Sequence, residues 1–126
     1  MRKFIIAALT AATMLPLHTQ AAPSIDNFEL RNAQDLVDLC AVPDNDPMVE
    51  AAHGFCYGFL SGAGSYHRAL NAGEDAHPIY CLPKTVVSRA EVARLFVDWS
   101  LANSQYMDEP AIDTLIRFAV QTWPCK

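Results

Sequence analysis

The sequence lacks the short motifs that would assign a common chemistry to it. It contains no glycine-rich phosphate loop, no serine-centred nucleophile elbow and no Cys-x-x-Cys pair. His53 lies three residues before Cys56, but no other histidine lies three residues from a cysteine, and His67 lies about 21 Å further along the same expected helix. We therefore expect a binding protein with no catalytic residues, no metal and no cofactor.

Basic side chains are also scarce. Nine lysines and arginines stand against 14 aspartates and glutamates, and Arg2 and Lys3 lie in a segment that we expect to be removed. The seven remaining basic side chains against fourteen acidic ones give residues 22–126 a formal charge of −7. Such a surface repels phosphate backbones, so we expect no nucleic-acid binding, whereas a basic protein partner would be attracted.

The first 21 residues have the three parts of a secretory signal peptide. A basic pair is followed by an apolar run over residues 4–17 and by the small residue Ala21, after which we expect cleavage. The apolar run is too short to span about 30 Å of hydrocarbon, and no second hydrophobic stretch follows it. We therefore expect one exported domain, residues 22–126, without a membrane anchor after cleavage.

The exported part contains all four cysteines of the chain, and an even number of cysteines in an exported chain indicates two disulfides. They are Cys40, Cys56, Cys81 and Cys125.

Helix start and stop signals predict an all-α fold, a small bundle of about four helices. Asn32 is expected to cap a first helix over residues 33–40, followed by a turn over residues 41–46. Asp46 is expected to cap a long second helix with Pro47 at its first position. This helix should stop near Gly73, with a loop over residues 74–80 behind it.

The third and fourth helices have clear boundaries in the sequence. Ser88 and Glu91 form a capping box, with a hydrophobic staple from the valines at positions 87 and 92, and the third helix should end near Asn103. Asp108 or Glu109 is expected to cap the fourth helix, which Pro110 opens and Pro124 terminates.

The long helix combines an apolar face with several glycines. Gly58, Gly62 and Gly64 should destabilise it by up to about 1 kcal/mol each relative to alanine. We expect close approach of another helix or of a disulfide to compensate. The apolar face has the spacing of a core-facing helix: Val49, Ala52, Phe55, Cys56, Phe59, Leu60 and Ala63.

Three motifs in order make the chain resemble the Tai/Rap immunity protein family, which protects bacteria against type VI secretion amidase effectors. The resemblance spans about residues 33–125, and Cys40 supplies an earlier cysteine. It implies a periplasmic, all-helical, often homodimeric protein without catalysis, which binds a peptidoglycan-cleaving amidase and blocks its active site. The motifs are Cys56-Tyr57-Gly58-Phe59-Leu60-Ser61-Gly62, Cys81-Leu82-Pro83 and Trp123-Pro124-Cys125, and they include Gly58, Gly62, Pro83 and Pro124.

The leading alternative is a periplasmic folding helper or stress-response protein without catalytic activity, which is also small, helical and disulfide-containing. Protonation of its carboxylates in acid would lower its charge and expose apolar surface. A saposin-like lipid-binding domain fits less well, because that framework normally has six cysteines.

Four cysteines allow three disulfide connectivities. The short connection between the third and fourth helices favours an antiparallel pair, which returns Cys125 to the start of the third helix beside Cys81. We therefore predict Cys81–Cys125 and Cys40–Cys56, and a bond between Cys56 and Cys81 would refute this pairing.

The connection over residues 103–109 is the predicted partner-binding site. Tyr106 and Met107 are apolar side chains in a polar setting, and Asp108 and Glu109 suit a basic target. In the alternative interpretation, Tyr106 and Met107 close the core beneath the turn while Asp108 caps the helix. A rival loop, residues 74–80, has similar charge but fewer large side chains.

Overall fold

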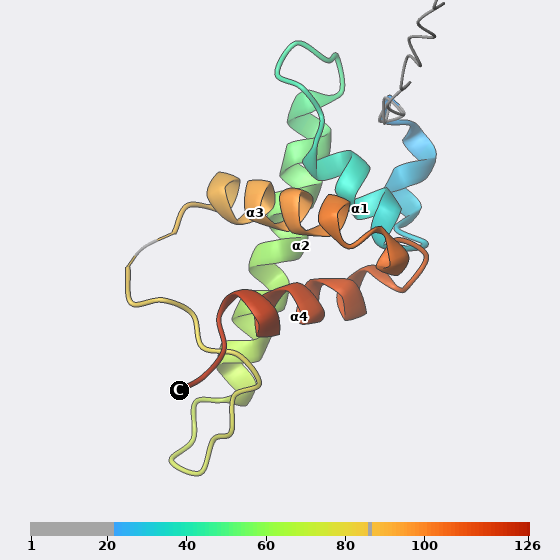
Figure 1. Cartoon of the computed structure of the whole chain (residues 1–126). Coiled ribbons are helices and arrows are strands. Elements are labelled where there is room, and N and C mark those ends of the chain that lie inside the picture. Colours follow the sequence, from blue (N-terminus) through green and yellow to red (C-terminus); the bar gives the residue numbers. More distant parts are fainter. Residues whose placement is uncertain (1–21, 86) are drawn as a thin grey trace, which may run out of the picture.

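The computed structural model describes residues 22–85 and 87–126, so the expected signal peptide, residues 1–21, lies outside the described residues (Figure 1). Helices and turns make up the described chain, which contains no strand, and the predicted all-α class is confirmed. The elements are a 3₁₀ helix η1 (Ile25–Glu29), α1 (Ala33–Cys40), α2 (Val49–Leu70), α3 (Arg89–Ala102), a 3₁₀ helix η2 (Ser104–Tyr106) and α4 (Ala111–Thr122).

The long helix α2 is the axis of the molecule. Helices α3 and α4 lie one beside the other and both cross it, while α1 lies against its N-terminal half (Figure 1). Helix α4 packs mainly on α1 and α3. Only the last turns of α2 extend past the bundle, and the loop that follows them returns to the C-terminal end of the chain (Figure 1).

The main core lies where α1, α2, α3 and α4 meet. Leu36 of α1, Phe96 of α3 and Phe118 of α4 are almost fully buried there, and the two phenylalanine rings meet edge to face with centroids 5.6 Å apart. Burying a side chain of this size stabilises the fold by roughly 1.5–3 kcal/mol. The disulfide between Cys40 and Cys56 joins α1 to α2 inside this core.

Helix α1 has the predicted bounds. The Asn32 side chain accepts a hydrogen bond from the backbone N–H of Asp35 at 3.1 Å, which satisfies one of the free donors of the first turn. Asp35 itself is buried and accepts hydrogen bonds from Asn27 and from Arg31. This polar network fixes the N-terminal 3₁₀ helix against α1.

Helix α2 is shorter at both ends than predicted. Asp46 does not cap it directly, because the Asp46 carboxylate accepts from Met48 N at 2.7 Å and holds Pro47 and Met48 in a turn before the helix. At the other end the chain leaves the helix at Asn71 rather than Gly73, and the Asn71 amide donates to the carbonyl oxygen of His67.

Helices α3 and α4 differ from the predictions at their caps. Ser88 accepts from Glu91 N as predicted, but the Glu91 carboxylate pairs with Arg94 instead of returning to Ser88, so only half of the capping box forms. The α3 end near Asn103 is confirmed. The predicted capping of α4 by Asp108 or Glu109 is wrong, because Pro110 occupies the cap position with an extended backbone and no side-chain hydrogen bond.

The glycines of α2 do not have the predicted packing role within the chain. A Cβ atom added at Gly58, Gly62 or Gly64 would meet no atom within 4 Å, and Gly58 and Gly62 are exposed. No helix or disulfide approaches their backbone, so the expected compensation is absent from the described chain.

Both disulfides have the predicted connectivity. Cys40 pairs with Cys56 across a Cα–Cα distance of 5.2 Å, and Cys81 pairs with Cys125 across 4.9 Å. The second pairing follows from the antiparallel arrangement of α3 and α4, which brings the end of α4 back to the loop before α3.

Candidate partner-binding surface

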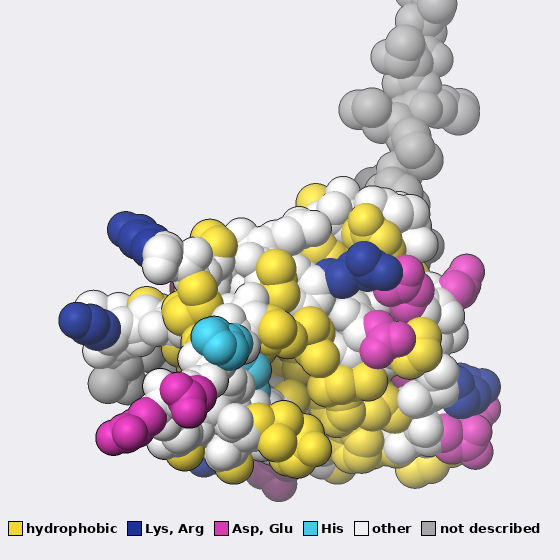
Figure 2. All heavy atoms as spheres, turned by 90° about the horizontal axis from the view of Figure 1, so that it is seen from below, with side chains coloured by type: hydrophobic (Ala, Val, Ile, Leu, Met, Phe, Trp, Pro, Cys, Tyr) yellow, Lys and Arg dark blue, Asp and Glu magenta, His cyan; other side chains and the backbone are white. Residues whose placement is uncertain are grey.

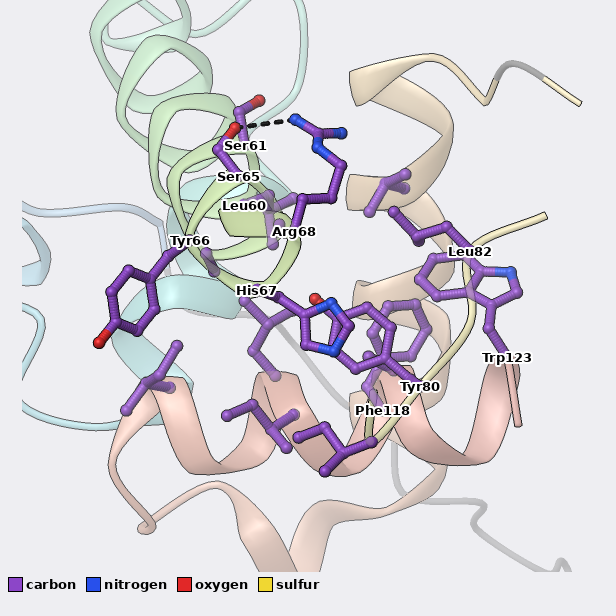
Figure 3. Close-up of a pocket in the computed structure, with 18 of the residues that line it drawn as sticks. Leu60, Ser61, Ser65, Tyr66, His67, Arg68, Tyr80, Leu82, Phe118 and Trp123 are labelled. Atoms are coloured by element: carbon purple, nitrogen blue, oxygen red, sulfur yellow. Dashed lines mark hydrogen bonds between the residues drawn. The ribbon is translucent and has the colours of Figure 1, made fainter. Parts of the chain in front are cut away.

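An apolar cleft of about 520 Å³ opens between the C-terminal half of α2, the loop that contains residues 79–82, and α4 (Figure 3). Leu60 and His67 of α2 line one side, and Tyr80 of the loop and Trp123 at the end of α4 line another. The cleft exists because α4 packs on α1 and α3 and leaves this part of α2 uncovered. Its size lies in the range of protein ligand sites, roughly 300–1,000 Å³.

Exposed apolar side chains concentrate at this cleft. Of the nine large hydrophobic side chains that are exposed in the described chain, six line it, and hydrophobic side chains gather at the centre of the face in Figure 2. Scattered exposed hydrophobic residues are normal on a soluble protein, whereas a contiguous apolar patch marks an interaction site. The six are Tyr66, Leu70, Ile79, Leu82, Ile112 and Ile116.

One wall of the cleft is a stack of His67 on Tyr80. The ring centroids lie 3.8 Å apart with an interplanar angle of 16°. Tyr80 is 6% exposed, and its burial raises the pKa of its phenol, an effect that nearby Arg68 opposes. The His67 Nε2 atom is buried without a hydrogen-bond partner among the described residues. The stack therefore attaches the loop to α2 through apolar contact rather than through hydrogen bonds of the ring.

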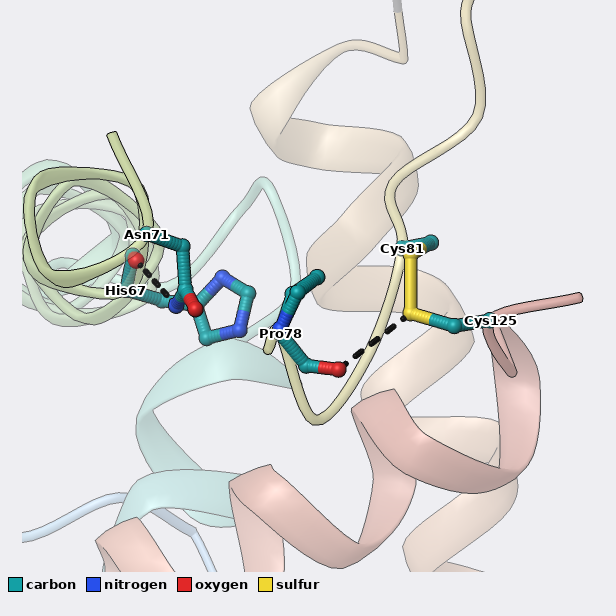
Figure 4. Close-up of a disulfide and its surroundings, with 5 residues drawn as sticks. All are labelled: His67, Asn71, Pro78, Cys81 and Cys125. Atoms are coloured by element: carbon teal, nitrogen blue, oxygen red, sulfur yellow. Dashed lines mark hydrogen bonds between the residues drawn. A yellow bond between two sulfur atoms is a disulfide. The ribbon is translucent and has the colours of Figure 1, made fainter. Parts of the chain in front are cut away.

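The exposed disulfide Cys81–Cys125 holds the loop to the end of α4 (Figure 4). Beside it, the N–H of Cys81 donates to the carbonyl oxygen of Trp123 at 2.8 Å, and Cys125 Sγ contacts the carbonyl oxygen of Pro78 at 3.4 Å. A disulfide sulfur carries no proton, so the second contact is not a donated hydrogen bond. The motif residues Pro83 and Pro124 flank this crosslink, and the loop cannot swing away from the cleft while the crosslink is intact.

The charged side chains that line the cleft are of one sign. Arg68 and Arg89 line it, and no aspartate or glutamate does. Arg68 donates to the hydroxyl of Ser65 at 3.0 Å (Figure 3), and neither arginine forms an ion pair within the described chain. The other three described arginines, Arg31, Arg94 and Arg117, all pair with carboxylates.

The residues of the predicted binding connection lie in a different place, and they divide into buried and accessible parts. Met107 is 9% exposed and belongs to the core, and its carbonyl oxygen accepts from Gln34 N at 3.0 Å. The Tyr106 ring stacks on Trp99 with centroids 5.9 Å apart. Asp108 is exposed, and Glu109 pairs with Arg117 at 2.9 Å. A role of these four residues in partner binding remains a prediction.

The other sequence candidates do not form a reactive group in the described chain. His53 Nε2 lies 2.9 Å from the carbonyl oxygen of Val42, and Cys56 is oxidised. Among the described residues, no three His, Cys, Asp or Glu side chains come together as a metal site. None of the described helices has the length and apolar character needed to cross a membrane.

The apolar residues of the cleft are visible in the sequence, but helical periodicity alone does not distinguish them from core residues. Tyr66 and Leu70 follow the core-facing stripe of α2 but lie beyond the point where α3 and α4 cover the helix. Ile79 and Leu82 flank Tyr80 and Cys81 in a segment without regular structure. Apolar residues on both sides of a predicted disulfide cysteine indicate that the crosslinked loop contributes to an apolar surface.

The family model for Rap1a immunity proteins matches residues 32–125, nearly the same span as the resemblance expected from the three motifs, and confirms it. No match was found among curated proteins or solved structures.

Proposed function

This chain belongs to the Rap1a immunity protein family, and from that premise we propose that it binds a peptidoglycan amidase delivered by type VI secretion and blocks the active site of that amidase in the periplasm. Membership of the family supports immunity against a secreted toxin. The match over residues 32–125 is the observation that carries the proposal, because it includes all four helices and both disulfides.

The periplasmic location is supported by two independent features. Residues 1–21 have the pattern of an export signal, and every cysteine of the chain is disulfide-bonded. Disulfides form and persist in oxidising compartments such as the bacterial periplasm. A peptidoglycan amidase acts in the same compartment, so the inhibitor and its target would meet there.

Inhibition without catalysis is supported by the make-up of the main surface feature. The cleft presents apolar side chains, two arginines and a histidine ring stacked on a tyrosine. Such a set can hold a partner through burial of apolar area and through charge. We propose that the protein inhibits by occupying the amidase and that it leaves peptidoglycan unchanged.

The direct test is titration of an amidase. An exported peptidoglycan amidase of the kind delivered by type VI secretion is purified and incubated with peptidoglycan at increasing amounts of the immunity protein, and amidases encoded near the gene of this chain are tested first. We expect muropeptide release to fall in proportion to added protein and to stop at a fixed stoichiometric ratio. Muropeptide release that is unaffected by an excess of the folded, disulfide-bonded protein would contradict the proposal, as would release by the protein alone.

A folding helper in the periplasm is the second candidate, and the exposed apolar cleft is the observation that favours it. The two functions differ in selectivity. A folding helper should suppress aggregation of unrelated unfolded proteins, and an immunity protein should not. Light scattering of a reduced, aggregating test protein with and without this chain separates them.

We also propose a homodimer and a partner contact through the connection over residues 103–109. Sedimentation of the exported form tests the first. For the second, Asp108 offers the accessible charge and the ring of Tyr106 the anchor, since Met107 lies in the core. Substitution of Asp108 by alanine removes charge without removing a core contact, so a loss of inhibition would locate the interface there.

A further inference from the structure

We infer that the cleft between α2, the loop at residues 79–82 and α4 is a toxin-binding surface in its own right, and that it binds an apolar segment of the toxin flanked by carboxylates. This inference rests on the proposed function and adds to it the surface and the chemistry of the segment recognised. It differs from the predicted connection at residues 103–109, none of which lines the cleft.

Large apolar side chains at the cleft are exposed to solvent. Leu70 of α2 is 65% exposed and Ile79 of the loop 55%, although both border one cleft. Leaving such side chains in water forgoes roughly 25 cal/mol for each Å² of apolar surface, which a partner that covers them would recover. Because apolar residues surround the opening as well as the floor, the best fit is a protein segment that also covers the rim.

The charged side chains of the cleft are two arginines. The chain as a whole is acidic, yet the cleft is lined by Arg68 and Arg89 and by no carboxylate. All other described arginines have carboxylate partners within the chain. A guanidinium group forms charge-assisted hydrogen bonds to a carboxylate, and salt screens a partly buried pair less than an exposed one. The segment recognised should therefore have acidic residues beside its apolar ones.

The cleft is formed before binding. The disulfide Cys81–Cys125 and the His67–Tyr80 stack hold the loop against the two helices, and the hydrogen bond from Cys81 to Trp123 adds a backbone link. A site whose walls are already fixed loses less conformational entropy on binding than one that must be ordered. A preformed cleft therefore favours tight binding of the toxin.

A second copy of the chain is a poorer occupant. If two copies met cleft to cleft, each would bring Arg68 and Arg89 and no carboxylate from the cleft lining. The two overall negative charges would add to the repulsion. The toxin is free of this constraint, because its charges are independent of those of this chain.

Matched substitutions on exposed side chains test the inference against the amidase used above. Leu70→Ser changes the cleft rim, and Ile25→Ser makes the same change of size and polarity at a side chain that is 76% exposed outside the cleft. Arg68→Glu reverses a cleft charge, and Lys84→Glu reverses an exposed charge that does not line the cleft. Dissociation constants are measured by titration calorimetry, and thermal unfolding verifies that each variant is folded.

We expect Leu70→Ser and Arg68→Glu each to raise the dissociation constant at least about tenfold, which corresponds to a loss of about 1.4 kcal/mol of binding free energy. The two controls should stay within about twofold, the usual effect of a change outside the contact. If wild type inhibits the amidase and the folded cleft variants bind as tightly as their controls, the inference is overturned while the proposed function stands. If wild type itself does not inhibit, the proposed function fails. If the cleft variants change only the sedimentation of the free protein, the cleft is a dimer contact and the inference is likewise overturned.

Discussion

Replacing Gly58 and Gly62 by alanine should stabilise the protein. Both residues lie inside α2 with exposed backbone, and a methyl group at either position would meet no atom within 4 Å. Alanine is favoured over glycine in the interior of a helix by roughly 0.5–1 kcal/mol, because glycine loses more backbone freedom on folding. With no steric cost to subtract, the double variant should gain about 1–2 kcal/mol in the free energy of unfolding.

This gain is large enough to measure by thermal unfolding followed by circular dichroism, with both disulfides intact. For a domain of this size a change of 1 kcal/mol shifts the midpoint by about 4–8 °C, so a gain of about 1–2 kcal/mol should raise the midpoint of the double variant by roughly 4–16 °C. The reverse change Ala51→Gly, at another exposed position of α2, serves as the control and should lower the midpoint. A midpoint that falls in the double variant would show that another backbone approaches these glycines, for example in a dimer.

Three further predictions concern other parts of the fold. Replacing Cys81 and Cys125 by serine should lower the free energy of unfolding by about 4 kcal/mol in the chain-entropy model for a separation of 44 residues. Urea unfolding of the variant and of the disulfide-bonded wild type measures this difference, and an unchanged midpoint would refute the crosslinking role. Burial raises the pKa of Asp35, but hydrogen bonds from Arg31 and Asn27 outweigh burial and hold that pKa below its usual value. Ionised Asp35 therefore stabilises the fold at pH values above the unfolded pKa of about 4. This stabilisation is lost as the pH falls through the lower pKa of the folded state. Asp35→Asn should thus cost about 2 kcal/mol at neutral pH, and the difference from wild type should shrink below about pH 4; a difference independent of pH down to acid unfolding would contradict this. Met107→Ala should destabilise the protein by about 2–5 kcal/mol because Met107 is buried in the core, whereas Asp108→Ala should leave the melting temperature nearly unchanged, and equal effects of the two would contradict the placement of Met107.

The features that could be predicted from the sequence are those decided by near neighbours in the chain. Asn32 and Asp35 meet through a hydrogen bond that spans three residues, so the start of α1 follows from local chemistry alone. The pairing of Cys81 with Cys125 depends on one contact between distant parts of the chain, the antiparallel packing of α4 on α3. That packing could be predicted because the connection between the two helices is short. In contrast, the Asp46 carboxylate can either cap a helix or accept a hydrogen bond in a turn. In the structure it accepts from Met48 N in a turn and does not cap α2.

Tertiary context decided the features that the sequence did not predict. Helical periodicity distinguishes the apolar side of α2 from the polar side, but it does not tell which turns of that side another helix covers. Leu60 is 8% exposed and Leu70 is 65% exposed, although both are leucines of the same helix. The difference arises because α4 lies on α1 and α3 and does not follow α2 to its end.

Because the C-terminal end of α2 is exposed, different residues should determine the stability of this protein and its inhibition of the toxin. The core contacts of Phe96 and Phe118 lie inside the bundle, whereas Leu70 and Ile79 lie beyond it and contribute little burial to the free chain. Substitutions at the cleft rim should therefore change binding without changing folding, and core substitutions should do the reverse. The crosslink Cys81–Cys125 belongs to both groups, because it constrains the unfolded chain and also fixes a wall of the cleft. Its loss should lower stability and affinity together, a coupling that neither group of single substitutions reproduces.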